Sequence, residues 1–255
     1  MSGKTYESLV TDQFGSRAEA YLASVVHAQG EDLQALVDMA RGHPAARVLD
    51  LGCGGGHVSY AVAPEVAEVT AYDLSAEMLT VVAKEAARRG LGNVVTRRGP
   101  AETLPFEAAS FDFVFCRMSA HHWRDFEAGL REAARVLRPG GRAGFVDVIS
   151  PGVPVLDTFL QAAEILRDPS HVRNRSRAEW EAATADAGFV ASVARSYRLR
   201  LDYAAWVERM RTPKLCADAI RALQAAMSGA VRRHFAIEAD GSFTIDTALF
   251  VLERS

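Results

Sequence analysis

The residues with the clearest capacity for chemistry form a glycine-rich segment that follows an apolar run. Residues 48–56, VLDLGCGGG, place the carboxylate of Asp50 near the end of a predicted strand, and four glycines follow before a predicted helix. Glycine permits a tight turn and removes the Cβ atoms that would keep a ligand away from the backbone. A second acid, Asp73, ends the next predicted strand 23 residues later, close to the spacing of about 20 residues expected for a ribose-binding acid. The combination predicts a nucleotide-type binding site.

Two details favour one class of nucleotide over another. A dinucleotide fingerprint beginning at Gly52 would require glycine at position 57, where the chain has His57. The carboxylate of Asp50 would also lie near a pyrophosphate, which is electrostatically unfavourable, whereas it suits a cationic amino-acid group. S-adenosyl-L-methionine (SAM) carries an adenine, a ribose and an α-amino group but no phosphate. The residues therefore predict SAM in preference to NAD.

The motifs of the chain resemble those of the class I SAM-dependent methyltransferases, in particular the UbiE-like or type 11 branch. The resemblance covers residues 44–150 and rests on six motifs that occur in the family's order. They are 48–56, 72–75 with Met78, 99–106 (GPAETLPF), 110–114 (SFDFV), the two histidines at 121–122, and 135–141 (RVLRPGG). Two further segments, 14–21 and 170–180, look like those of YafE-type bacterial members of this branch. The motifs are specific for the family and not for a substrate.

The resemblance assigns cofactor-binding roles residue by residue. The methionine moiety is expected at Asp50, Gly52, Cys53 and Gly54, and the ribose hydroxyls at Asp73. The alternative interpretation of Asp73 is a simple acid at a helix N-terminus. Cys53 and Cys116 are expected to be small buried residues rather than nucleophiles.

The adenine and the sulfonium are expected to contact a second group of residues. Leu74 and Met78 are expected beside the adenine, Ala101 and Glu102 at its border, and Arg117 under the sulfonium. The family commonly has Asp in the segment where this chain has Pro100. The adenine amine would therefore be bound by Glu102, by a backbone group or by water instead of by that Asp. The alternative interpretation of Glu102 is a loop residue that is exposed to solvent and does not contact the cofactor. The product of the cofactor would be S-adenosyl-L-homocysteine.

The acceptor is expected beside the loop that follows the predicted strand at 111–116. Ligands bind at the carboxyl ends of parallel strands, which places His121, His122 and Trp123 near the acceptor. Methyl transfer depends mainly on alignment of the reacting atoms, and a base is needed only when the acceptor must lose a proton. We expect His121 and Arg117 to be catalytic, and His122 to be mainly structural while contacting the substrate. No neighbouring residue completes a metal-ligand set, so no metal is expected.

A basic segment is expected to cap the acceptor. Residues 167–233 carry 13 Lys and Arg against 7 Asp and Glu in a chain of net charge −3. Within it, His171, Arg173, Asn174 and Arg209 are predicted substrate-binding residues, because arginine suits a planar anion. A solvated helical surface is the alternative for this charge. Arginines and aromatics are not interleaved as in nucleic-acid platforms, so no nucleic-acid partner is expected.

The elements that must position these residues alternate between strands and helices. Strands are predicted at 47–50, 68–73, 94–96, 111–116, 142–149, near 189–200 and at 243–252, with helices near 57–63, 75–89 and 125–137. Near-continuous apolar strands in this order are typical of a parallel sheet covered on both faces. We expect an α/β, Rossmann-like fold with a seven-stranded, mostly parallel sheet whose last strand is antiparallel.

The chain is expected to form one domain over residues 1–255. Residues 1–43 would form a helical N-terminal lid (Phe14, Tyr21 and His27), 44–150 the SAM-binding core, and 151–255 the substrate cap and final strands. Ser75 is expected to cap the helix at 75–89 and Gly90 to end it, residues 176–179 form a capping box, and 138–141 form a turn.

Composition restricts the class of protein. The 255 residues are 49% hydrophobic and 24% charged, with three cysteines, and no stretch approaches the roughly 18 apolar residues that span a bilayer. The N-terminus shows no secretory pattern, so we expect a cytoplasmic protein without a membrane partner. The predicted function is methyl transfer to a small molecule, either anionic or quinone-like. The alternatives are a SAM-binding protein without transferase activity and, third, an NAD-dependent oxidoreductase.

Overall fold

A seven-stranded sheet runs through the part of the chain that the structure describes, which is residues 5–15 and 29–254 of a computed structural model. The strands lie in the order β3-β2-β1-β4-β5-β7-β6. Their bounds are β1 Arg47–Leu51, β2 Glu68–Asp73, β3 Val94–Arg98, β4 Phe111–Arg117, β5 Leu137–Val148, β6 Phe189–Leu201 and β7 Phe243–Arg254. The first five strands are mutually parallel, and β7 is antiparallel to both β5 and β6. The predicted fold class, with an antiparallel last strand, is confirmed.

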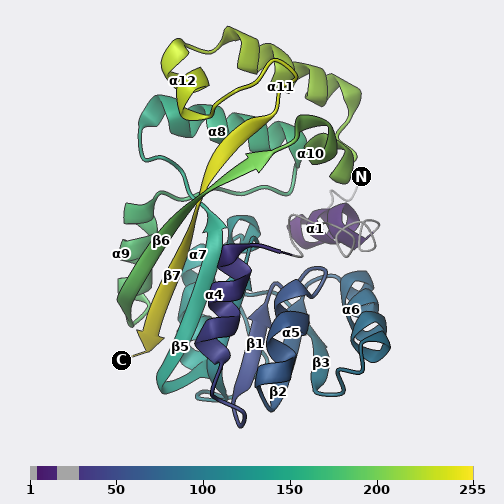
Figure 1. Cartoon of the computed structure of the whole chain (residues 1–255), viewed down its shortest axis with the longest axis vertical. Helices are drawn as coiled ribbons and strands as arrows, with labels where there is room; N and C mark the ends of the chain where they lie inside the picture. The colour runs from purple at the N-terminus through teal and green to yellow at the C-terminus, as the bar shows by residue number, and fades with distance from the viewer. Residues whose placement is uncertain (1–4, 16–28, 255) are drawn as a thin grey trace.

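Helices cover both faces of this sheet (Figure 1). On one face, α4 (Glu31–Ala40) and α5 (His57–Val62, extended by a short 3-10 turn at Ala63–Glu65) pack against Val48, Phe113 and Phe115. On the other face, α7 (Phe126–Val136) and α9 (Arg177–Asp186) pack against alternate residues of the same strands, such as Leu49 and Val114. Because successive strand side chains point to opposite faces, each strand contributes to two cores. A further helix, α6 (Ala76–Arg88), packs beside β2 and β3.

A second layer of helices lies beyond the carboxyl ends of the strands, at the top of Figure 1. It contains α8 (Pro154–Arg167), α10 (Tyr203–Arg209), α11 (Lys214–Ala226) and α12 (Gly229–His234). These helices share a separate apolar cluster with Leu201 of β6 and with Phe243 and Ile245 of β7. The long strands β6 and β7 therefore join the upper layer to the sheet.

Local signals place the helix ends where the sequence predicts them. The Ser75 hydroxyl accepts a hydrogen bond from the Met78 amide at 3.2 Å, and Gly90 follows α6 with φ of 72°. Ser176 and Glu179 form the predicted capping box at the start of α9. These bonds occupy amides that the first helical turn leaves without partners.

One predicted boundary is wrong. Residues 138–141, predicted as a turn before a strand at 142–149, lie within the bounds of β5. Leu137 pairs with Phe111, and pairing resumes with Arg142 opposite Phe113, so the residues between them form an irregularity in the strand. Leu137 already belongs to the sheet because it fills the core beside Phe111. The proline and glycines therefore bulge inside the strand instead of preceding it.

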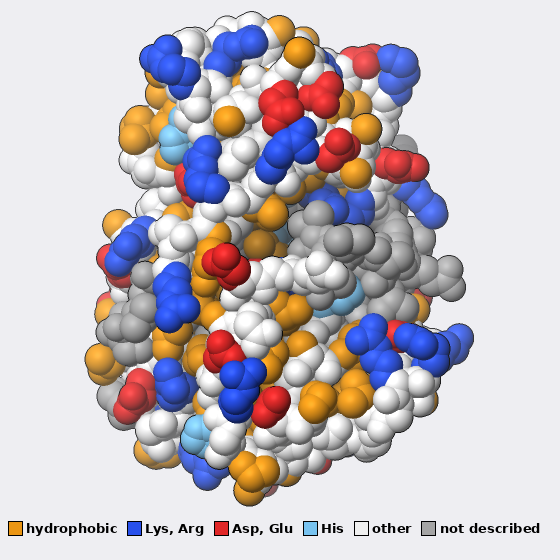
Figure 2. Space-filling model, in the orientation of Figure 1, with side chains coloured by type: hydrophobic (Ala, Val, Ile, Leu, Met, Phe, Trp, Pro, Cys, Tyr) orange, Lys and Arg blue, Asp and Glu red, His pale blue; other side chains and the backbone are white. Residues whose placement is uncertain are grey.

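The charged residues of the basic segment are interspersed with acids. Figure 2 shows Lys and Arg beside Asp and Glu over the upper layer. Several of these arginines and lysines form exposed pairs, including Arg177–Glu181, Arg200–Glu238 and Lys214–Asp218. Within the described residues, no helix is long and apolar enough to cross a membrane.

Candidate active site

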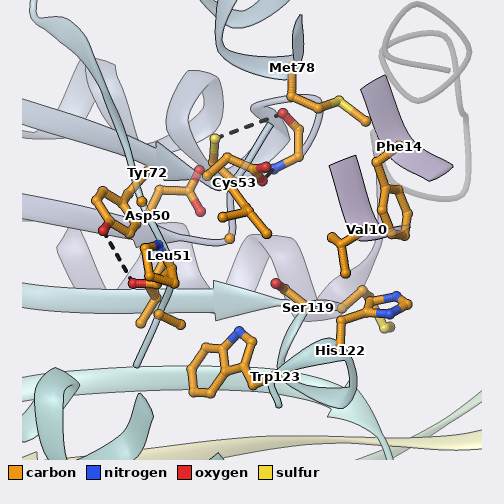
Figure 3. A pocket seen from close by; sticks show the side chains of 18 of the residues that line it. Val10, Phe14, Asp50, Leu51, Cys53, Tyr72, Met78, Ser119, His122 and Trp123 are labelled. Carbon is orange, nitrogen blue, oxygen red and sulfur yellow. Dashed lines mark hydrogen bonds between the residues drawn. The ribbon is translucent and has the colours of Figure 1, made fainter. Parts of the chain in front are cut away.

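A cavity opens at the carboxyl ends of β1, β2 and β4, under helix α1 (Tyr6–Gly15). Its walls come from the glycine loop, the end of β2, the loop at 99–102 and the segment after β4 (Figure 3). The structure brings together at this cavity all of the predicted cofactor-binding residues, namely Asp50, Gly52, Cys53, Gly54, Asp73, Leu74, Met78, Ala101, Glu102 and Arg117. These residues come from segments that are separated by up to 67 positions in the chain.

The glycine loop has a backbone conformation that residues with a Cβ atom rarely adopt. Gly52 and Gly54 have φ of 72° and 49°, in the left-handed region. A Cβ atom at Gly52 would collide with Ser119, whereas one at Gly54 would meet no heavy atom within 4 Å. The amides of Gly52 and Cys53 both donate to the Tyr72 carbonyl, at 2.8 and 3.0 Å, and tie the loop to β2. The loop is thus fixed at one end and open at Gly54.

Asp50 lies at the bottom of the cavity and is buried. Its Oδ2 atom accepts hydrogen bonds from the Ser59 amide at 2.9 Å and the Ser59 hydroxyl at 2.6 Å. Neither bond uses the other oxygen, Oδ1. Burial raises the pKa of Asp50 to about 7 despite these bonds, so a cation placed beside it would favour its charged form.

Asp73 is held at the junction of the glycine loop and α6. Its Oδ2 accepts from the Gly54 amide and its Oδ1 from the Ser75 amide, both at 2.9 Å. Burial raises the pKa of Asp73, while the amide bonds oppose the rise. The carboxylate therefore lies at the lip of the loop, where its orientation is set by backbone.

Two predicted cofactor residues have protein partners at the cavity wall. Glu102 accepts bonds from the amides of Arg124 and Asp125, at 2.9 and 3.3 Å, and so fixes the segment after β4. The Arg117 guanidinium forms a buried ion pair with Asp32 at the start of α4, with Nε and Oδ2 separated by 2.6 Å. Both side chains line the cavity, but their charged ends bind the protein.

Helix α1 closes one side of the cavity. The Tyr6 hydroxyl lies 2.6 Å from the His122 carbonyl and 2.7 Å from the Ser170 carbonyl, and so links α1 to two other segments. Val10 and Phe14 face the cavity, and the Phe14 ring meets the His122 ring edge to face at 5.0 Å (Figure 3). The lid was predicted from Phe14, Tyr21 and His27, of which Tyr21 and His27 lie outside the described residues. Tyr6 and Val10 were missed.

His121 belongs to a buried pair that the sequence analysis missed. Its Nδ1 lies 2.5 Å from Oδ1 of Asp147, and its amide donates to Oδ2 of the same carboxylate at 3.0 Å. Burial lowers the pKa of His121, but the charge and hydrogen bond of Asp147 outweigh it, so the net pKa is raised above 6.5. Asp147 near the carboxyl end of the buried strand β5 was the available signal. The pair leaves Nε2 of the imidazole facing away from Asp147.

The other residues of the HHW segment have structural contacts. His122 Nδ1 lies 3.0 Å from the Ser170 carbonyl, and burial lowers the pKa of His122 to about 4. Trp123 is buried against Gly129 and Phe126 in the main core. Both still line the cofactor cavity.

A second cavity adjoins the first, on the side of the upper layer. It shares Phe14, Arg117, Met118 and His122 with the first cavity, and it is also lined by His121. Arg209 of α10, one of the predicted substrate-binding residues, also lines it.

Three other predicted substrate residues line neither of these cavities. Arg173 forms ion pairs with Glu179 and Asp157, at 3.1 and 3.5 Å. His171 is buried and bonds Gln161, and burial lowers the pKa of His171 to about 2. Asn174 is buried, and its backbone amide donates to Oε1 of Gln161 at 3.1 Å. All of these residues and Arg209 lie within the basic segment 167–233, so their position in the sequence could not distinguish them. Among the residues described, no group of His, Cys, Asp or Glu forms a metal site.

Comparison with known proteins gives consistent matches. A family model described as a methyltransferase domain matches residues 49–145. YafE of Escherichia coli, an uncharacterised protein, is 48% identical over 195 residues, which cover 76% of this chain and 94% of YafE. YcgJ of Bacillus subtilis, an uncharacterised methyltransferase, is 40% identical over 200 residues, which cover 78% of this chain and 79% of YcgJ. The crystal structure of YcgJ superimposes with a TM-score of 0.84 at 35% identity and covers 88% of this chain and 97% of that one.

Proposed function

Because the chain belongs to the class I SAM-dependent methyltransferases of the UbiE-like type 11 branch, we propose that it binds SAM in the glycine-loop cavity and methylates a small molecule in the adjoining cavity. The observation that carries this proposal is the contact between the two cavities. They share Arg117, Met118 and His122, and His121 lines the second. The residues with a capacity for proton transfer thus adjoin the residues predicted to hold the cofactor.

The first cavity offers groups that match the parts of SAM. The buried Asp50 suits the α-ammonium group, and the Asp73 carboxylate at the lip of the loop suits the ribose hydroxyls. Leu74, Met78 and Ala101 supply the apolar wall that an adenine requires. The open space at Gly54 lets the ligand approach the backbone, since a Cβ there would project into it. When bound, SAM supplies an electrophilic methyl group on a sulfonium.

The protein has two tasks in the transfer step. The walls of the second cavity hold the acceptor atom in line with the methyl, and this alignment supplies most of the rate. His121 accepts the proton that the acceptor loses, at Nε2, because Asp147 occupies Nδ1 and fixes the tautomer. The methyl–sulfur bond breaks as the methyl–acceptor bond forms, and the proton remains on the imidazole until it exchanges with water.

The acceptor is a small molecule that is either anionic or quinone-like. The anionic alternative draws support from Arg209 in the wall of the second cavity. The quinone-like alternative draws support from relatives such as the demethylmenaquinone methyltransferase of Chlorobaculum parvum, which is 34% identical over 116 residues, 45% of this chain and 46% of that protein.

The test is a labelling experiment with a metabolite extract. The protein is incubated with SAM carrying a deuterated methyl group, and products are separated by mass spectrometry. We expect S-adenosyl-L-homocysteine to accumulate together with one metabolite class that gains three deuterium atoms. The His121→Asn variant, which keeps the cofactor cavity, should bind SAM equally and lose most of the turnover. Saturable SAM binding without any labelled product would contradict the transferase proposal.

A further inference from the structure

Met118 lies at the boundary between the two cavities. The described residues that line both of them are Phe14, Arg117, Met118 and His122. Arg117 is held by its ion pair with Asp32. The His122 ring is held by its contact with the Ser170 carbonyl. Met118 is half-buried and contributes an unbranched apolar side chain, so its size affects how far the two cavities are separated.

The backbone of Met118 has a conformation that residues other than glycine rarely adopt. Its φ of 55° lies in the left-handed region, although its amide still donates to the Val146 carbonyl of β5 at 2.8 Å. The other described non-glycine residues with a positive φ line neither cavity, and they are Ala109, Arg211 and Ala236. Strained residues cluster at functional sites, and a glycine would avoid the strain. The presence of a side chain at position 118 therefore indicates that the side chain itself has a role.

The turn at Met118 places it next to the segment expected to hold the methionine moiety. Met118 directly follows β4, and the next residue, Ser119, lies so close to Gly52 that a Cβ atom on that glycine would collide with it. Ser119 also lines the first cavity (Figure 3). Because Met118 lines both cavities, it lies on the path from the expected position of the sulfonium to the second cavity.

The side chain of Met118 packs against two apolar clusters. One is the cluster under α4 and α5, which includes Val48 and Phe115. The other is the cluster of the upper layer, which includes Leu201 and Trp206. Of the residues that the structure describes, Met118 alone packs against both. It is thus held from two sides, and a larger ligand group could displace it only at the expense of this packing.

We propose that Met118 limits the alkyl group on the sulfonium of the cofactor to the size of a methyl group. This inference rests on the proposed cofactor site and names the residue that selects the transferred group. The group on the sulfonium must face the acceptor for in-line transfer. Any added carbon would therefore extend into the boundary between the cavities, where the side chain of Met118 occupies the space.

The test compares two cofactors that differ only in the group on sulfur. SAM and its S-allyl analogue are titrated by calorimetry into the unmodified protein and into variants at position 118. We expect the unmodified protein to bind the allyl analogue about tenfold more weakly than SAM or worse, which is the expected effect of overpacking. Met118→Gly, which opens the boundary and relieves the backbone strain, should reduce this ratio to about threefold or less. Met118→Leu, which keeps the volume, should retain most of the ratio.

Met78→Ala is the matched control. Met78 is buried on α6 and lines the first cavity but not the second, on the side expected to hold the adenine. Its removal should weaken the binding of both cofactors alike and leave their ratio unchanged. Met118→Ala also opens the boundary, and it provides the same comparison if the glycine variant does not fold.

The outcomes separate this inference from the proposed function. Absence of SAM binding to the unmodified protein would refute the proposed cofactor site, and this inference with it. Normal SAM binding with equal affinity for the allyl analogue would refute only the role of Met118. An unchanged ratio in a Met118→Gly or Met118→Ala protein that binds SAM would also refute that role, since another residue would then set the size limit. An equal fall of the ratio in Met78→Ala would contradict it as well, because the whole cavity would then have loosened.

Discussion

The pairing of Asp147 with His121 makes a prediction about pH dependence. A base must be neutral to accept a proton, so turnover should rise as pH increases through the pKa of His121. Asp147 raises that pKa, whereas burial lowers it. In Asp147→Asn burial still lowers the pKa of His121, and only the weaker influence of Glu164 and Asp168 still raises it, so the midpoint of the acid limb of kcat should move to lower pH.

The same variant should lose rate at its plateau. The fixed tautomer is lost with the carboxylate, and we expect kcat to fall by about a hundredfold, at the lower end of the range of roughly 10²–10⁴ that acid–base assistance supplies. The matched control is Asp246→Asn, which removes the partner of His234 at 2.9 Å in the upper layer. An Asp147→Asn profile that kept its midpoint and lost only amplitude would show that Asp147 is merely structural.

Individual site residues differ in how far sequence alone could identify them. Asp50 and Asp73 follow from strand ends and spacing, because a parallel sheet brings successive carboxyl ends to one edge. Asp147 lies 26 positions from His121, and no local pattern encodes the contact between them. Arg117, predicted to lie under the sulfonium, lines the cavity, but its ion pair with Asp32 depends on where α4 docks. The sequence alone therefore does not predict which charged groups pair with each other when they are far apart in the chain.

At the scale of elements, the hydroxyl of Tyr6 holds α1 over the cofactor cavity. Removing it in Tyr6→Phe deletes the one proton that the hydroxyl donates to the His122 and Ser170 carbonyls, which both lie within hydrogen-bond distance, at a cost of about 1 kcal/mol. We expect SAM to dissociate roughly fivefold faster, which stopped-flow measurements would detect. Tyr203→Phe is the control, since its hydroxyl bonds the Ala217 carbonyl at 2.6 Å away from this cavity. Equal dissociation rates for the two variants would show that α1 does not retain the ligand.

The glycine loop gives a second prediction at this scale. Gly54→Val should abolish SAM binding, because its side chain enters the open space of the cavity and its φ of 49° is strained. Gly140→Val serves as the control for strain alone, since Gly140 has φ of 72° and open space in the irregular part of β5. We expect this control to melt at a lower temperature and bind SAM normally. SAM binding by Gly54→Val would place the cofactor elsewhere.

Helices and strands could be predicted from the sequence where the capping or turn residues agree with the pattern of apolar residues. Ser75 and the 176–179 capping box mark helix starts because their side chains bond the first amides directly. The start of β5 was mispredicted because Pro139 and Gly140 are typical turn residues. There the core position of Leu137 outweighs local propensity. Tertiary packing therefore decides boundaries that local chemistry does not.

At the scale of the whole molecule, Trp180 connects α9 to the main core. It is 2% exposed, and its ring lies 4.6 Å from Phe126 and 4.9 Å from Phe250. Trp180→Ala should cost about 3–5 kcal/mol of folding free energy. For a chain of this size the melting temperature should fall by roughly 10 °C. Leu215→Ala, at an 81% exposed position, should melt like the unmodified protein. Similar melting temperatures would show that α9 contributes little to stability.

The cap illustrates what composition can and cannot reveal. The sequence assigns residues 151–255 to a substrate cap and final strands, and α8 to α12, β6 and β7 lie in that range. Which arginines face the acceptor depends on helix docking. Arg209 lines the second cavity, whereas Arg173 bonds Glu179 outside it. A count of charges cannot make this distinction, because it contains no information on the helix face that each residue occupies.

Binding of SAM in the glycine-loop cavity can be examined by a calorimetric comparison. SAM and NAD⁺ are each titrated into the unmodified protein and into Asp73→Ala. The proposed SAM site predicts one bound SAM per chain, no NAD⁺ binding, and at least tenfold weaker SAM binding in the variant, because charge-assisted bonds to the ribose hydroxyls are lost. Equal SAM affinity in both proteins, or saturable binding of NAD⁺ to the unmodified protein, would contradict it.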